Sequence, residues 1–149
     1  MKILFVCLGN ICRSPMAEYI LKKKCAERNL DWEIDSSGTE HYHVGAGADP
    51  RGVRTALKHG IDMRAHVARQ LTKKDFDHYD IIYSLATDVT HEISHIAKSE
   101  ERMKKVRLFM DELFPGEKKS VPDPWYGSEK DFEPVFELVE RVCEEIVSK

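Results

Sequence analysis

The sequence has no long hydrophobic run. No segment approaches the roughly 18 consecutive apolar residues that a membrane-spanning helix needs. The only apolar stretch near the N-terminus, residues 3–8, is shorter than the core of a secretory leader. It is followed by Gly9, Asn10 and Arg13 and not by the small residues of a signal-peptide cleavage site. We therefore expect a cytoplasmic protein without a membrane span.

The sequence also lacks a charge excess of either sign. Its 23 Lys and Arg residues against 26 Asp and Glu residues leave a formal net charge of −3. Nucleic-acid-binding proteins neutralise phosphates with an excess of Lys and Arg, so this balance argues against nucleic acid as a partner. At this length, and without a linker, repeat or low-complexity tract, residues 1–149 are expected to form a single domain.

Cysteine is scarce, with four residues, at positions 7, 12, 25 and 143. Four cysteines are too few, in a chain that can bury its own core, to indicate the disulfide framework of a secreted protein. No Cys-x2-Cys pair is present, so a four-cysteine zinc site has no starting point. We expect reduced thiols that serve packing or chemistry, and neither a metal nor a cofactor.

Short apolar runs alternate with amphipathic segments along the chain. Strands are expected at residues 3–6, 32–36, 79–85 and 106–110. Helices are expected from about residue 14 to 29, 50 to 57, 88 to 97 and 132 to 147, with a short helical segment capped by Thr72. Asp49 is the expected N-cap of the second helix, and Thr87 or Asp88 that of the helix ending near Ala97. Such alternation is typical of an α/β fold. The predicted fold is a three-layer sandwich with a four-stranded parallel sheet and helices on both faces.

Two helix starts depend on the position of a proline. Ser14 followed by Pro15 predicts a helix with Ser14 as its N-cap. In the last helix, Asp131 as N-cap leaves Pro134 in the first turn, where no N–H is needed. An earlier start would place this proline inside the helix at a cost of ~3 kcal/mol. We therefore expect that helix to begin after Asp131.

Between the first strand and the first helix lies a Cys-x5-Arg-Ser loop, residues 7–14. Ligands of open α/β sheets bind at the carboxyl ends of strands. Gly9 and Asn10 tolerate the positive φ angles with which successive backbone N–H groups converge on an anion at a helix N-terminus. Arg13 adds a planar fork that matches two phosphate oxygens. The loop predicts a site for a tetrahedral dianion.

Cys7 is the candidate nucleophile of this loop. A field that binds an anion also favours the thiolate, which is the nucleophilic form of cysteine. Ser14 is close enough in sequence to donate a hydrogen bond to the sulfur. An isolated cysteine is usually a packing residue, but here the strand, the Gly-Asn turn and the helix start all indicate chemistry.

The segment VCLGNICRSPMAE, residues 6–18, resembles the signature of the low-molecular-weight protein tyrosine phosphatases. Further matches follow in the family's order: residues 37–39, 43–45 and 49–51 resemble its variable loop, His66 with Arg69 its histidine segment, and residues 123–127 (DPWYG) its acid loop. The resemblance covers nearly the whole chain.

The resemblance implies metal-free hydrolysis of phosphotyrosine through a cysteinyl-phosphate. Cys7 would attack phosphorus, and Arg13 with the loop N–H groups would hold the phosphate oxygens. Asp123 would protonate the leaving phenolate and then activate the water that releases phosphate. The expected partners are proteins that carry phosphotyrosine, with inorganic phosphate as product and inhibitor and the chain as a monomer or weak dimer.

The resemblance also assigns the surroundings of the nucleophile. Asn10, Ser14 and His66 would form a hydrogen-bonded network that holds the loop. Contacts with the substrate are expected from the loop and from aromatic walls that enclose a phenyl ring: Leu8, Gly9, Asn10, Ile11, Cys12, Ser14, Tyr42, Trp125 and Tyr126.

Cys12 has two possible roles. It either packs passively or resolves an oxidised Cys7 by forming a disulfide within the loop. Cys25 and Cys143 lie on apolar helical stripes and are expected in the core.

Three rival functions have less support in the sequence than a tyrosine phosphatase. His91 and His95 match His-Glu-x-x-His, but no third zinc ligand is evident and a solvated helix face is the simpler explanation. Related arsenate reductases use two further redox cysteines in mid-chain, and none lies between Cys25 and Cys143. Related arginine phosphatases carry threonine at the position of Ile11, where a hydroxyl group suits a polar phosphoguanidinium. The isoleucine of this sequence favours an aromatic ester instead.

Overall fold

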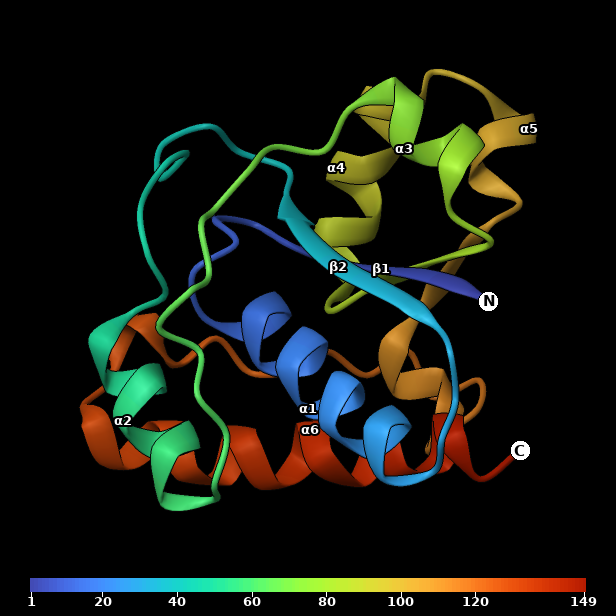
Figure 1. The fold of residues 1–149 in the computed structure, drawn as a ribbon. Coiled ribbons are helices and arrows are strands. Elements are labelled where there is room, and N and C mark those ends of the chain that lie inside the picture. The colour runs from blue at the N-terminus through green and yellow to red at the C-terminus, as the bar shows by residue number, and fades with distance from the viewer.

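A four-stranded parallel sheet forms the middle layer of the computed structural model, which describes residues 1–149 (Figure 1). The strands are β1 (Lys2–Cys7), β2 (Glu33–Gly38), β3 (Ile81–Ser84) and β4 (Val106–Leu108), in the spatial order β2-β1-β3-β4. Every pairing is parallel. The predicted fold class, an α/β three-layer sandwich, is confirmed.

Strand β1 separates two apolar clusters. Ile3 and Phe5 belong to the larger cluster, with α1 (Arg13–Glu27) and α6 (Phe132–Val147) on one face of the sheet. Leu4 and Val6 belong to the smaller cluster, on the face covered by α4 (Thr87–Ala97). Because both faces are covered, β1 is a continuous apolar run and not an alternating one.

The remaining helices complete the two outer layers. Helix α2 (Pro50–Lys58) packs against α6, and α3 (Lys73–His78) and α5 (Glu100–Met103) pack against α4 (Figure 1). Asp49 caps α2, and Thr72 caps α3, as expected. No helix is both long and apolar enough to cross a membrane.

Several element boundaries differ from the sequence prediction. The last strand ends at Leu108, and the chain enters the short 3-10 helix η1 (Phe109–Glu112) so that Phe109 packs edge-on against Phe5 and Tyr83. Helix α4 has Ala86 as its N-cap, not Thr87 or Asp88, because Ser120 Oγ accepts the Thr87 N–H at 2.9 Å. These boundaries depend on partners distant in sequence.

The two proline-dependent helix starts have different outcomes. Helix α6 begins after Asp131 with Pro134 in its first turn, as predicted. Helix α1 begins at Arg13 with Cys12 as its N-cap, so the predicted N-cap role of Ser14 is wrong. The Ser14 hydroxyl is instead turned toward the Cys7 sulfur, 2.9 Å away.

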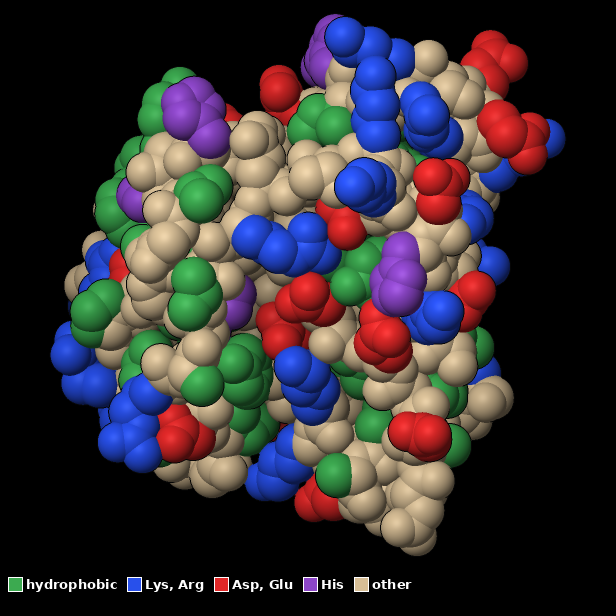
Figure 2. Space-filling view, turned by 45° about the horizontal axis from the view of Figure 1, so that its top comes forward, with side chains coloured by type: hydrophobic (Ala, Val, Ile, Leu, Met, Phe, Trp, Pro, Cys, Tyr) green, Lys and Arg blue, Asp and Glu red, His purple; other side chains and the backbone are tan.

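The face shown in Figure 2 carries interspersed Lys, Arg, Asp and Glu side chains. No large area of this face has one sign of charge, in line with the nearly balanced composition. Apolar side chains on the same face form small separate groups.

The carboxyl ends of the two central strands form the crevice of the sheet. The chain leaves β1 toward one side for β2 and reaches β3 on the other side, and ligands of open α/β sheets bind outside such a switch point. Gly38, at the end of β2, packs directly against the loop that follows β1. A Cβ atom there would lie 2.5 Å from the Leu8 carbonyl oxygen and 3.0 Å from the Asn10 nitrogen.

We expect Gly38→Ala to distort the loop after β1, because the new methyl group would meet backbone atoms that cannot move separately. Overpacking of this kind costs about 1–3 kcal/mol of the free energy of unfolding. Gly47→Ala is the matched control, since its Cβ would meet only the His66 carbonyl oxygen, at 3.8 Å. Urea unfolding measures both, and equal midpoints for the two variants would contradict the prediction.

Candidate active site

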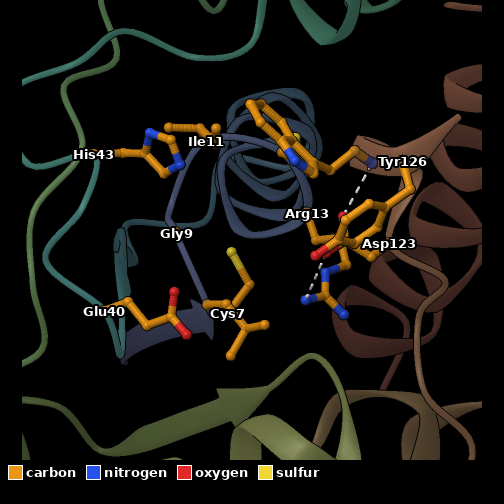
Figure 3. Close-up of a pocket in the computed structure, with 11 residues that line it drawn as sticks. Cys7, Gly9, Ile11, Arg13, Glu40, His43, Asp123 and Tyr126 are labelled. Atoms are coloured by element: carbon orange, nitrogen blue, oxygen red, sulfur yellow. Dashed lines mark hydrogen bonds and ion pairs between the residues drawn. The ribbon is translucent and has the colours of Figure 1, made fainter. Parts of the chain in front are cut away.

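A pocket lies over the loop that joins β1 to α1. Its floor and walls come from three parts of the chain: this loop, the segment after β2, and the segment that precedes α6 (Figure 3). The lining residues are Cys7, Leu8, Gly9, Ile11, Cys12, Arg13, Glu40, His43, Asp123, Trp125 and Tyr126.

Cys7 ends strand β1, and its side chain points into the pocket (Figure 3). The residue is buried, with Ser14 Oγ 2.9 Å from the sulfur. The Asn10 side-chain amide donates to the same Ser14 oxygen at 2.9 Å. The Ser14 hydroxyl therefore accepts a hydrogen bond from Asn10, and its own hydrogen has two acceptors within reach, the Cys7 sulfur and the Ser37 carbonyl oxygen at 3.4 Å. Donation to the sulfur would stabilise a thiolate.

Arg13 and Asp123 lie side by side on one wall of the pocket (Figure 3). Arg13 Nη2 is 3.6 Å from Asp123 Oδ2, and Arg13 Nη1 donates to the Val121 carbonyl oxygen at 3.1 Å. The Trp125 N–H donates to the other carboxylate oxygen, Asp123 Oδ1, at 3.1 Å. The Asp123 side chain is 29% exposed and lines the pocket.

Asn10 holds the shape of the loop from beneath. It is fully buried with a φ of +58°, a left-handed conformation that asparagine tolerates better than most residues. Its amide donates to Ser14 Oγ and Ser36 Oγ, both at 2.9 Å, and Oδ1 accepts the Arg69 N–H at 3.0 Å. His66 Nε2 lies 2.7 Å from the Asn10 carbonyl oxygen and must therefore carry the proton.

Glu18 extends this network from helix α1. Its carboxylate accepts a hydrogen bond from Ser36 Oγ at 2.6 Å and lies 3.8 Å from His66 Nδ1. Both Glu18 and His66 are buried. The loop therefore rests on polar groups whose hydrogen bonds are made within the protein.

Cys12 is buried at the start of α1, 4.0 Å from the carboxylate of Asp49. Burial, together with the negative charge of Asp49, raises the pKa of the Cys12 thiol far above its ordinary value. Burial would also raise the pKa of Asp49, but hydrogen bonds from Arg51 lower it below the usual value of a carboxyl. Cys12 is therefore a neutral thiol in a site built around an anionic carboxylate.

Comparisons with known proteins agree with this arrangement. The family model described as low molecular weight phosphotyrosine protein phosphatase matches residues 2–149. The chain belongs to this family. A phosphatase of the same description from Gallus gallus is 38% identical over 149 residues, which are 99% of this chain and 94% of the relative.

Solved structures share the fold of this phosphatase. A protein tyrosine phosphatase from Entamoeba histolytica superposes with a TM-score of 0.92 at 36% identity, covering 100% of this chain and 96% of the other. An arginine phosphatase superposes with a TM-score of 0.91 at 25% identity, covering 99% and 94%.

The structure of this phosphatase brings most of the expected site residues together. The following line the pocket: Cys7, Leu8, Gly9, Ile11, Cys12, Arg13, Asp123, Trp125 and Tyr126. Asn10 and Ser14, expected as substrate contacts, do not line the pocket and are fully buried. Their side chains are hydrogen-bonded to each other beneath the loop, and His66 contacts the Asn10 carbonyl oxygen.

Tyr42, an expected aromatic wall, does not line the pocket. It is 73% exposed, and its ring packs on His41 with 4.8 Å between ring centres. His43 takes that place, because its ring packs close over Gly9 and lies 5.6 Å from the Trp125 ring. The pocket also contains Glu40, which no sequence pattern indicated. His43 lies in a segment that resembles the family's variable loop, but the sequence did not predict its ring as a wall of the pocket.

No group of three or more His, Cys, Asp or Glu side chains is arranged to hold a metal ion. His91 and His95 do share one face of α4, with 3.1 Å between their Nε2 atoms. They are solvent-exposed and lack a third ligand.

We expect Asn10→Gly to destabilise the phosphatase, because it keeps the left-handed backbone but removes three buried hydrogen bonds. Leaving their partners unpaired costs about 1–3 kcal/mol of the free energy of unfolding. Asn29→Gly is the matched control, since Asn29 has a φ of +56° but is exposed. If urea unfolding gives the same midpoint for both variants, the Asn10 side chain does not support the loop.

Proposed function

We propose that this phosphatase hydrolyses phosphotyrosine through a cysteinyl-phosphate on Cys7, with residues 1–149 acting as one catalytic domain. The observation that supports the proposal most directly is the convergence of three groups on one pocket. These are the Cys7 sulfur, the Arg13 guanidinium and the Asp123 carboxyl group. Phosphoryl transfer requires a nucleophile, fixed positive charge for the phosphate oxygens and a proton for the leaving group.

In the first step, the Cys7 thiolate attacks phosphorus and the bond to the phenolic oxygen breaks. The Asp123 carboxylic acid gives its proton to that oxygen, so tyrosine leaves as a neutral phenol. Arg13 turns from the Asp123 carboxylate to two phosphate oxygens, which bear more charge in the transition state. The loop N–H groups hold the remaining charge.

In the second step, the Asp123 carboxylate takes a proton from water while the water oxygen attacks phosphorus. The sulfur–phosphorus bond breaks, the Cys7 thiolate is restored, and inorganic phosphate is released. Phosphate thus binds at the loop as a product and inhibits at high concentration. Asp123 serves first as acid and then as base, because the first step leaves it as the carboxylate that the second step requires. The second step protonates it again for the next turnover.

The pocket walls favour an aryl ester. Leu8 and Ile11 give the entrance an apolar lining, and the rings of Trp125 and Tyr126 stand at its rim. Trp125 and Tyr126 are 42% and 88% exposed, so apolar surface is available for a phenyl ring and for a protein substrate around it. A phosphoguanidinium group would find no polar partner at Ile11, which disfavours arginine phosphatase activity.

Arsenate reduction finds less support than phosphate ester hydrolysis. Cys25 and Cys143 are buried in the larger apolar cluster, with α1 and α6. Neither thiol lines the pocket, so neither is placed to serve as a redox partner of Cys7. The role of Cys12 as the partner of an oxidised Cys7 stays a prediction. A Cys7–Cys12 disulfide forms by attack of the Cys12 thiolate on an oxidised Cys7, and burial of Cys12 opposes its ionisation.

Hydrolysis of p-nitrophenyl phosphate at mildly acidic pH tests the nucleophile. We expect Cys7→Ser to abolish turnover while inorganic phosphate still binds, as measured by isothermal titration calorimetry, and EDTA to leave the wild-type rate unchanged. Cys25→Ala, a buried cysteine away from the pocket, is the control and should retain activity. Turnover by Cys7→Ser, or loss of wild-type activity in EDTA, would refute the mechanism.

Two aryl phosphates test the acid. We expect Asp123→Asn to lower kcat/KM for phenyl phosphate by on the order of 10²–10⁴, the usual range for general acid catalysis. The loss should be much smaller for 2,4-dinitrophenyl phosphate, because its leaving group departs without a proton. Equal losses for the two substrates would show that Asp123 is not the acid.

A further inference from the structure

Arg51 lies in the first turn of α2 and is paired closely with the N-cap residue Asp49. Arg51 Nε donates to Asp49 Oδ1 at 3.0 Å and Nη2 donates to Oδ2 at 2.8 Å. The Arg51 N–H also donates to Oδ1, at 2.9 Å. The Asp49 side chain is 5% exposed, so this two-point pairing fixes the guanidinium on a buried support.

The outer edge of the same guanidinium reaches the segment that carries Asp123. Arg51 Nη1 donates to the Gly127 carbonyl oxygen at 2.9 Å, and Nη2 donates to the Trp125 carbonyl oxygen at 3.2 Å. The guanidinium carbon also lies 4.7 Å from the centre of the Phe132 ring. Arg51 therefore holds the carboxyl-terminal end of the short 3-10 helix η2 (Pro124–Tyr126) that follows Asp123.

The segment 123–127 has few other supports. Its remaining backbone hydrogen bonds are internal, from the Trp125 N–H to Asp123 Oδ1 and from the Gly127 N–H to the Pro124 carbonyl oxygen. Only Pro124 is buried among its residues. A segment with so little buried surface depends on specific hydrogen bonds for its position.

Asp49 is in turn tied to the loop that carries Cys7. The Asp49 N–H donates to the Ile11 carbonyl oxygen at 2.9 Å, and the Asp49 carboxylate lies 4.0 Å from the Cys12 sulfur. A continuous chain of contacts thus runs from Ile11 through Asp49 and Arg51 to the carbonyl groups of Trp125 and Gly127. Asp49 and Arg51 join the two halves of the pocket without lining either wall.

We propose that Arg51 is a positioning residue that sets the distance between the Asp123 carboxyl group and the phosphate-binding loop. The inference rests on the proposed role of Asp123 as general acid. Arg51 does not line the pocket, so it acts on the acid through residues 123–127, by hydrogen bonds to their backbone and by the Trp125 ring, whose centre lies 5.7 Å from the guanidinium carbon. Its contribution is therefore largest for substrates whose leaving group needs a proton.

Arg51→Gln tests this inference on phenyl phosphate and 2,4-dinitrophenyl phosphate. We expect kcat/KM to fall roughly tenfold to a hundredfold for phenyl phosphate, the scale of a misplaced catalytic group, and less than about threefold for 2,4-dinitrophenyl phosphate. Arg51→Lys keeps the positive charge beside Asp49 but cannot span two carbonyl groups. It should show a smaller loss that again falls mainly on phenyl phosphate.

Arg64 provides a matched control within the same chain. Its backbone and side chain pair with Asp62 in the same two-residue pattern, at 3.0, 2.9 and 2.8 Å, but on an exposed surface and with no hydrogen bond to residues 123–127. We expect Arg64→Gln to leave kcat/KM unchanged for both substrates. A loss there would mean that the effect of Arg51→Gln is not specific to its contacts.

Two results would overturn the inference. Equal losses of kcat/KM for both esters in Arg51→Gln and Arg51→Lys would assign Arg51 to general folding or to phosphate binding, and no loss would show that its contacts are dispensable. The Asp123→Asn variant, measured alongside, separates the two proposals. If Asp123→Asn lowers kcat/KM equally for the two esters, the assignment of Asp123 as the acid fails. If Asp123→Asn discriminates between the esters and Arg51→Gln does not, only the role of Arg51 fails.

Discussion

The buried side chain of Asn10 is the interaction on which the rest of the site depends. Its amide and carbonyl groups join helix α1, strand β2 and the segment before α3 to one point beneath the loop that follows β1. In a protected interior each of these hydrogen bonds is strong, and each would be costly to leave unmade. The loop can therefore hold a left-handed turn and a row of N–H groups that an isolated peptide of this sequence would not keep.

The same network connects stability to chemistry. Ser14 accepts a hydrogen bond from Asn10 and lies 2.9 Å from the Cys7 sulfur, so in the proposed mechanism a group that supports the loop also stabilises the thiolate. Gly38 allows β2 to approach the loop closely enough for Ser36 to join the network. Close packing at the strand end and the electrostatics of the nucleophile are therefore parts of one arrangement.

The second half of the site is attached differently. Asp123 lies on a segment that is exposed over most of its residues and is joined to the body of the protein through Arg13 and Arg51. Arg13 contacts the Asp123 carboxylate directly, whereas Arg51 contacts the backbone carbonyl groups of Trp125 and Gly127 and the Trp125 ring. In the proposed mechanism, this division lets Arg13 turn from Asp123 to the substrate while Arg51 keeps the Asp123 segment in place.

Local patterns in the sequence were sufficient for the architecture and for the position of the loop between β1 and α1. The apolar run at the start of the chain, the left-handed Asn10 and the proline in the first turn of α6 each act through near neighbours, and the structure agrees with them. Gly9 does not adopt the positive φ angle that was expected of it beside Asn10. Contacts between distant residues decided the rest. The start of α1 at Arg13, the replacement of Tyr42 by His43 at the pocket wall and the support of the acid segment by Arg51 all depend on groups brought together by folding. A sequence determines which residues can form a helix, bind an anion or carry a proton, because those properties are local. Which of them face one another follows only from packing the layers around the sheet, since hydrogen bonds between distant segments leave no periodic trace in the chain.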